Sequence, residues 1–120
     1  MDHEQPAMQV TEKPWGREVL VACTERYALK DIFLRAGTRS SLQSHVRKHE
    51  TILVIEGRIR LERGGPEGPL SEEIVETGGA YIVTPGTRHR VTALEDTRLI
   101  EASTPELDDL IRHADDYGRQ

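Results

Sequence analysis

The chain has 120 residues, of which 36% are hydrophobic and 31% are charged, and its formal net charge is −5. This length supports one domain with a single core. The acidic balance, without a basic run, argues against nucleic-acid binding. No apolar run approaches the about 18 residues of a membrane span. The lone Cys23 cannot form an internal disulfide and no signal-like N-terminus is visible, so we expect a cytoplasmic protein.

The first twelve residues are polar and show no periodicity, which predicts a flexible N-terminal arm over 1–12 and a single domain over 13–120. Residues 27–34 alternate in character and predict a strand. Lys30 lies on the more aliphatic face of that strand, together with Ile32 and Leu34. A lysine there either extends to the rim or lines a polar cavity.

The stretch 34–57 contains the residues best suited to chemistry. Gln43 and His45 are two residues apart, so an extended segment points both side chains the same way, and Glu50 follows five residues later. An amide oxygen, an imidazole and a carboxylate suit a divalent metal such as zinc, iron, manganese or nickel. Each of these residues alone would more often be an ordinary hydrogen-bonded or solvated side chain. His49, beside Glu50, is the nearest competitor for a ligand position.

The segment around Gly57 predicts two strand halves. Residues 52–55 are almost continuously apolar, whereas residues 58–62 alternate, which predicts a strand buried first on both sides and then on one. Residues 64–71 are rich in glycine and proline and predict a loop.

Further short strands are predicted over 72–76, 80–83 and 97–102, and the alternation of residues 89–94 predicts another. In that last strand His89 shares its face with Val91 and Ala93, which indicates the interior. Arg90 follows His89 directly, and its parity points it away from the same face.

The C-terminal region changes period. Leu107, Leu110, Ile111 and Ala114 fall at helical spacing, which predicts an amphipathic helix over 105–117. Pro105 suits the first turn of such a helix, and Gly118 is placed to end it.

The two groups of residues resemble the signature motifs of the cupin superfamily. The first motif reads Gln43-x-His45, Glu50 and Gly57, and the second reads Gly78, Gly86 and His89. The runs KPWG (13–16), SLQSH (41–45) and DDLIRHADDYGR (108–119) are similar to the C-terminal cupin domain of bifunctional mannose-6-phosphate isomerase/mannose-1-phosphate guanylyltransferases. Departures occur at 46–47, where those enzymes tend to carry histidines, and at Thr84, where the second motif usually has its proline.

This resemblance implies an all-β fold, a small cupin β-barrel (jelly roll) with a short C-terminal helix. It also implies one divalent metal ion (Zn, Fe, Mn or Ni). Its expected ligands are Gln43, His45, Glu50 and His89. Small cupins commonly dimerise through sheets or edge strands, so a homodimer is expected.

The activity implied by the resemblance is that of a metal-dependent aldose–ketose isomerase or epimerase acting on a phosphorylated sugar. Such chemistry needs a metal for the developing negative charge, a base that shuttles a proton, and a cation for the phosphate. Lys30, Arg90 and His49 are the candidates for catalytic roles. No carboxylate besides Glu50 presents itself clearly as the base, and residues 39, 47 and 48 are predicted to form a solvated charge cluster.

Two alternatives stay open at this point. The chain could be a non-catalytic module that binds a carbohydrate or another small molecule. It could also be another cupin enzyme, such as a cyclase or a dioxygenase, because one fold of this kind hosts many chemistries.

Overall fold

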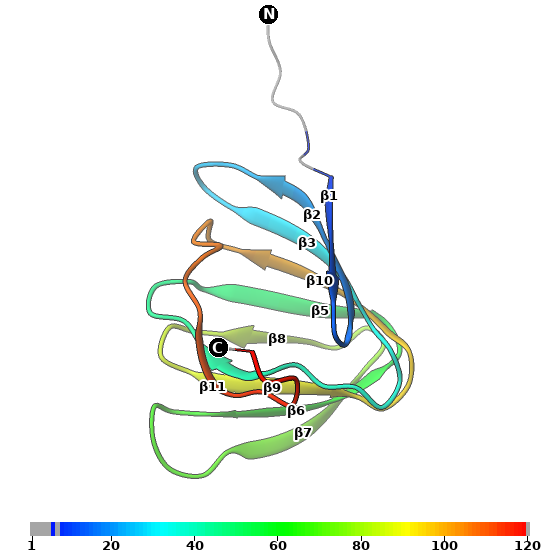
Figure 1. Ribbon diagram of the computed structural model, residues 1–120, viewed down its shortest axis with the longest axis vertical. Helices are drawn as coiled ribbons and strands as arrows, with labels where there is room; N and C mark the ends of the chain where they lie inside the picture. Colours follow the sequence, from blue (N-terminus) through cyan, green and yellow to red (C-terminus); the bar gives the residue numbers. More distant parts are fainter. Residues whose placement is uncertain (1–5, 7, 120) are drawn as a thin grey trace, which may run out of the picture.

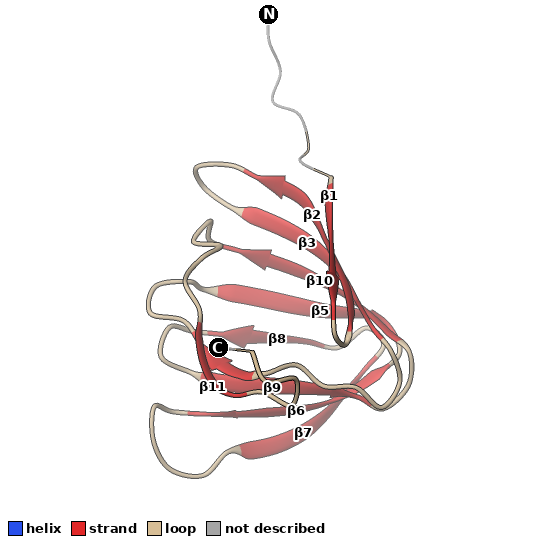
Figure 2. Ribbon diagram, in the orientation of Figure 1, coloured by secondary structure: helices blue, strands red, loops and turns tan. Residues whose placement is uncertain are grey.

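The computed structural model describes residues 6 and 8–119, and these residues form only strands, turns and loops (Figure 2). The strands are β1 (Gln9–Lys13), β2 (Gly16–Cys23), β3 (Ala28–Leu34), β4 (Leu42–Ser44), β5 (Glu50–Glu56), β6 (Arg58–Gly64), β7 (Ser71–Glu76), β8 (Ala80–Val83), β9 (Arg88–Ala93), β10 (Thr97–Ser103) and β11 (Ile111–Ala114). The all-β prediction is therefore confirmed.

The strands form two antiparallel sheets (Figure 1). One sheet has the order β1-β2-β3-β10-β5-β8, and the other has the order β11-β4-β9-β6-β7. The chain passes repeatedly from one sheet to the other, as in a jelly roll. Two sheets that each turn one face inward enclose an interior between them, and side chains from both sheets fill it.

Gly57 lies where the chain leaves β5 in one sheet and enters β6 in the other. Its φ of +111° is unfavourable for residues with a side chain. A Cβ atom built there would lie 2.7 Å from the carbonyl oxygen of Asp96. The glycine therefore permits both the backbone turn and the close approach of the 96–97 segment.

The apolar run of β5 alternates in burial. Ile52 and Val54 are buried in the core, whereas Leu53 and Ile55 are each 38% exposed on the outer face of the sheet. The prediction that this half of the strand is buried on both sides is therefore wrong. The physical reason is that only the inner face of β5 has a partner layer in this chain.

The N-terminal prediction has two parts. Residues 9–12, assigned above to the arm, belong to β1, which pairs with β2 in the register Gln9↔Leu20 to Lys13↔Gly16. The backbone groups of β2 gain a partner strand in this way. Residues 1–5 and 7 of the predicted arm lie outside the described residues.

The predicted C-terminal helix over 105–117 is wrong. Residues 105–110 form a loop with a turn, residues 111–114 form β11, and β11 pairs with β4 through Ile111↔Ser44 and Arg112↔Gln43. The apolar residues that suggested a helix cover no core, since Leu107 and Leu110 are 37% exposed. A short helix without a buried face is marginal, whereas pairing with the edge of β4 satisfies backbone groups of both strands. No helix among residues 6 and 8–119 has the length and hydropathy needed to cross a membrane.

Candidate metal centre

A cavity of about 190 Å³ lies between the two sheets, and residues of the C-terminal segment, including Asp109 and Arg112, form part of its wall. The volume is smaller than the about 300–1,000 Å³ of pockets that hold drug-sized ligands, so it suits a small ligand. Apolar core side chains form part of its wall. The polar and charged part of the lining includes Lys30, His45, Lys48, Glu50, His89 and Glu101.

Three of these side chains converge on one point. His45 follows β4, Glu50 begins β5, and His89 is the second residue of β9, so the three come from different strands or their ends. The Nε2 atom of His45 lies 3.5 Å from Oε1 of Glu50, and Nε2 of His89 lies 3.2 Å from the same oxygen. All three side chains are buried, and their potential ligand atoms lie within 4.8 Å of one another. This His–Glu–His cluster could bind a metal ion.

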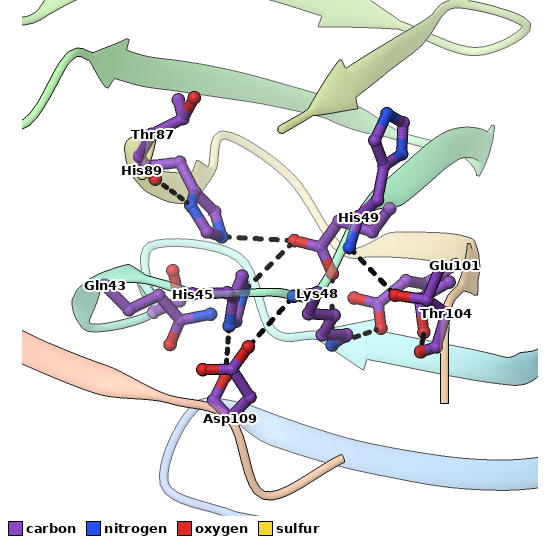
Figure 3. A network of polar contacts seen from close by, with 12 residues as sticks. Gln43, His45, Lys48, His49, Thr87, His89, Glu101, Thr104 and Asp109 are labelled. Carbon is purple, nitrogen blue, oxygen red and sulfur yellow. Dashed lines mark hydrogen bonds and ion pairs between the residues drawn. The ribbon is translucent and has the colours of Figure 1, made fainter. Parts of the chain in front are cut away.

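In each imidazole, the hydrogen bond of Nδ1 determines which ring nitrogen carries the proton. Nδ1 of His45 lies 2.6 Å from the carbonyl oxygen of Asp109, and Nδ1 of His89 lies 3.1 Å from that of Thr87 (Figure 3). Because a carbonyl only accepts hydrogen bonds, both Nδ1 atoms donate. In the neutral rings the Nε2 lone pairs therefore point towards Glu50, and Nε2 of His45 has no hydrogen-bond partner in the described part of the chain.

Three electron-rich atoms facing one another in a buried site need a cation between them, either a proton or a metal ion. Burial opposes protonation of His45, but the nearby carboxylate of Glu50 and the hydrogen bond to the Asp109 carbonyl outweigh this effect and raise its pKa. Burial likewise opposes ionisation of Glu50. The contacts from both histidines and the charge of Lys48 outweigh it and hold the pKa of Glu50 well below its ordinary range. The residues present thus fit a divalent metal ion.

Gln43 lies beside the cluster. It pairs in register with His89 across β4 and β9, and it lines the cavity. Its Oε1 atom accepts a hydrogen bond of 2.8 Å from the hydroxyl of Ser41. An amide oxygen has two lone pairs, so one remains for a further partner. Figure 3 shows Gln43 next to His45.

A buried lysine joins the cluster to a second carboxylate. Nζ of Lys48 lies 3.1 Å from Oε2 of Glu50 and 3.1 Å from Oε2 of Glu101 (Figure 3). Lys48 is only 5% exposed, so its assignment to a solvated charge cluster is wrong. Burial opposes its charge, but the two carboxylates outweigh this and raise its pKa. Burial, followed by the charge of Glu50, raises the pKa of Glu101 to about 7.

The three residues predicted for catalytic roles lie in different surroundings. Lys30 lines the cavity and pairs with Glu18 at 3.2 Å. Arg90 is buried and donates hydrogen bonds to the carbonyl oxygens of Ser40 and Ala114, so it joins β9 to neighbouring segments. His49 is exposed, and its ring points away from the cluster (Figure 3). Of the three, only Lys30 is brought into the cavity.

Sequence reasoning missed Glu101 and the position of Asp109. Glu101 lies two residues after the buried Leu99 on the same face of β10, so strand parity could have indicated that it points inward. Asp109 holds the turn after β4 through contacts that depend on the path of the C-terminal segment. The predicted helix concealed that path.

Comparison with known proteins agrees with this architecture. The chain is 28% identical over 121 residues to mannose-1-phosphate guanylyltransferase ManC of Salmonella typhimurium, an alignment that covers 98% of this chain and 24% of that protein. It is 30% identical over 115 residues to the xanthan biosynthesis protein XanB of Xanthomonas campestris, covering 89% of this chain and 23% of that protein. The chain therefore spans about a quarter of the length of these curated relatives.

Solved structures share the fold. KdgF from a Halomonas species superposes with a TM-score of 0.73 and 22% identity, covering 83% of this chain and 90% of the other. Oxalate decarboxylase from Bacillus subtilis superposes with a TM-score of 0.76 and 19% identity, covering 89% of this chain and 30% of the other. Residues 32–102, which include the His–Glu–His cluster and most of both sheets, match the cupin domain family. The chain belongs to the cupin family.

Proposed function

We propose that this chain binds one divalent metal ion, zinc, iron, manganese or nickel, inside its barrel. His45, Glu50 and His89 are the proposed ligands, and the amide oxygen of Gln43 is the proposed fourth. The observation that carries the proposal is the convergence of two Nε2 atoms on one oxygen of Glu50, while both Nδ1 atoms are held by backbone carbonyls. Neutral imidazole and ionised carboxylate are the ligand forms that such ions prefer.

We further propose that the substrate is a small phosphorylated sugar and that the reaction is an aldose–ketose isomerisation. Similarity over 98% of this chain to a mannose-1-phosphate guanylyltransferase, of which it covers 24%, supports a sugar phosphate as ligand. When bound, the metal ion supplies positive charge for the sugar oxygens on which negative charge develops.

Glu101 is the proposed proton carrier. It lines the same cavity as the cluster, and Lys48 holds its carboxyl group at 3.1 Å. With a pKa raised to about 7, this side chain can both release and accept a proton near neutral pH. It therefore offers the base that the sequence did not indicate.

The cavity also offers cationic groups for a phosphate. Lys13 from β1, Arg112 from β11 and Arg119 from the C-terminal segment line its wall. Arg119 is anchored by two contacts to Asp115, at 3.1 Å and 2.8 Å. Guanidinium groups bind phosphate oxygens in a fork and ammonium groups bind them as point charges, so these residues are the proposed phosphate contacts.

The proposal is tested by metal analysis and by a screen of phosphorylated aldoses. Purified protein is loaded with each of the four ions, and proton NMR follows conversion of sugars such as mannose 6-phosphate into the ketose. We expect one bound ion per chain, and exchange that is lost in Glu101→Gln. Absence of metal under saturating conditions with all four ions would overturn the site.

A second candidate is a non-catalytic module that binds a carbohydrate or another small molecule. The contact between Lys48 and Glu50 favours it, because this lysine already balances the charge of the buried carboxylate without a metal. Binding of a sugar phosphate by metal-free protein, without any aldose–ketose exchange, would identify this function.

We also propose a homodimer. Leu53 and Ile55 of β5 and Ile82 of β8 are 38%, 38% and 52% exposed on the outer face of two paired strands. Exposed apolar side chains on adjacent strands favour contact with a partner sheet. Light scattering at micromolar concentration should return about twice the chain mass of 13.5 kDa, and a value equal to the chain mass would exclude the dimer.

A further inference from the structure

The C-terminal segment makes several hydrogen bonds with the turn that carries His45. Asp109 lies in the loop before β11, outside residues 32–102 that match the cupin family. Figure 3 shows its side chain directly beside His45 and the start of the turn. β11 then pairs with β4, the strand that ends immediately before His45.

The carboxylate of Asp109 accepts three backbone hydrogen bonds from this turn. The N–H of Val46 donates to Oδ1 at 2.9 Å, and the N–H groups of Arg47 and Lys48 donate to Oδ2 at 2.6 Å and 2.9 Å. The hydrogen bond from Val46, with that from Arg47 next, lowers the pKa of Asp109 to about 2. One side chain thus satisfies three successive donors and defines the conformation of the turn.

The backbone of the same residue holds the imidazole. The carbonyl oxygen of Asp109 accepts the hydrogen bond from Nδ1 of His45 at 2.6 Å. That contact determines which nitrogen carries the proton and leaves Nε2 facing Glu50. Because the carboxylate ties this backbone to the turn, the position of the carbonyl depends on the side chain.

We propose that Asp109 is a positioning residue for metal binding, an inference that rests on the metal site proposed above. Its carboxylate clamps the turn of residues 46–48 onto the C-terminal segment, and its carbonyl sets the tautomer and direction of the His45 ring. Groups that hold a ligand histidine by its second nitrogen typically change metal affinity about 10- to 100-fold when they are lost. The C-terminal segment then contributes to metal binding by positioning His45.

The test compares Asp109→Ala and Asp109→Asn with Asp108→Asn. Asp108 is the adjacent, exposed carboxylate, so its substitution makes the same charge change as Asp109→Asn without touching the turn. Isothermal titration with zinc or manganese ions measures affinity, and circular dichroism verifies folding. We expect Asp109→Ala to weaken binding about 10- to 100-fold. Asp109→Asn should weaken it less, because one oxygen can still accept, and Asp108→Asn should match the wild type.

A second readout needs no metal. Nitrogen-15 NMR of the histidine rings, above the pH at which they titrate, reports the tautomer of each one. We expect the His45 ring to carry its proton on Nδ1 in the wild type and to become mixed in Asp109→Ala, with His89 unchanged. If Asp109→Ala does not fold, Asp109→Asn carries both comparisons.

The outcomes separate the two proposals. Wild-type affinity and an unchanged His45 tautomer in folded Asp109 variants would overturn the role of Asp109 while leaving the metal site standing. A wild-type protein that binds no metal would overturn the site itself. The NMR comparison would then decide alone whether Asp109 fixes the His45 ring.

Discussion

The interior has two regions that are almost equally withdrawn from water but opposite in chemistry. In the apolar region, Val54 and Leu61 are 0% exposed. In the region around the cavity, Glu50 is 3% exposed and Lys48 is 5% exposed. Burial alone therefore does not tell which part of the barrel stabilises the fold and which part carries function.

The difference lies in what burial does to each kind of group. Removing apolar surface from water stabilises the fold by about 25 cal/mol per Å². Removing charged groups from water costs free energy that pairing recovers only in part. The apolar region is thus the main source of stability. The charged region lowers stability, and buried charges of this kind are typical of functional sites. Each prediction below tests this division.

The largest expected loss of stability follows from Leu61→Ala in the apolar region. Truncating a fully buried leucine removes apolar contact and leaves a cavity, which typically costs about 2–5 kcal/mol. Urea denaturation measures the free energy of unfolding. Ile74→Ala, which truncates a side chain that is 50% exposed on β7, is the matched control and should cost much less. Equal losses in the two variants would contradict the assignment of the core.

His89→Ala addresses the charged region. We expect this variant to lose most of its bound metal, because one of three converging ligand atoms is removed. The loss of affinity should exceed the about 10- to 100-fold expected for a group that only orients a ligand. The fall in unfolding free energy should be smaller than for Leu61→Ala. Metal content is measured by mass spectrometry, and undiminished binding would remove His89 from the site.

Glu101→Gln tests the free-energy cost of burying a charged carboxylate, through the pH dependence of the free energy of unfolding. Burial raises the pKa of Glu101 from its ordinary 4.5 to about 7, so the folded protein holds this proton more tightly than the unfolded chain. The associated stability is complete below pH 4.5 and is lost as pH rises to about 7. A glutamine does not ionise, so Glu101→Gln does not undergo this loss. The stability of the variant relative to the wild type should therefore increase between pH 4.5 and about 7.

The control for this measurement is Glu72→Gln, which replaces an exposed carboxylate on β7. Its stability difference from the wild type should stay nearly constant between pH 4.5 and 7. If Glu101→Gln behaves in the same way, the Glu101 carboxyl titrates as it does in the unfolded chain. The cost assigned to the charged region would then be absent at this residue.

The features that the sequence could predict are those that depend on neighbouring residues. The alternation of short strands, the break at Gly57 and the inward face of His89 follow from local pattern, because strand parity and turn geometry are properties of neighbouring residues. The spacing of His45 and Glu50 also indicated a shared site. The two side chains meet because of the order in which the strands pair, and the motif spacing matches that order.

The rest depended on contacts between distant segments. Lys48 looked like a solvated turn residue, but in the structure it is buried between the carboxylates of Glu50 and of Glu101, which lies far along the chain. The helical spacing of residues 107–114 was real, but periodicity does not reveal whether a free strand edge competes for the segment. Pairing with β4 decided that competition. Asp109 could not be assigned a role before this path was known.

The smallest effect is expected from His49→Ala. His49 is adjacent to Glu50 in sequence, and its residue type suits a metal site as well as that of His45. In the structure, it is the backbone of His49 that is held, by two hydrogen bonds with Thr104. The N–H of His49 donates to Oγ1 of Thr104 at 3.0 Å, and its carbonyl accepts from the N–H of Thr104 at 3.0 Å. Alanine keeps both contacts and leaves the exposed ring position empty. Metal affinity should therefore remain within a small factor of the wild type, in contrast to His89→Ala. A loss of bound metal comparable to that of His89→Ala would mean that His49, and not one of the three buried residues, completes the site.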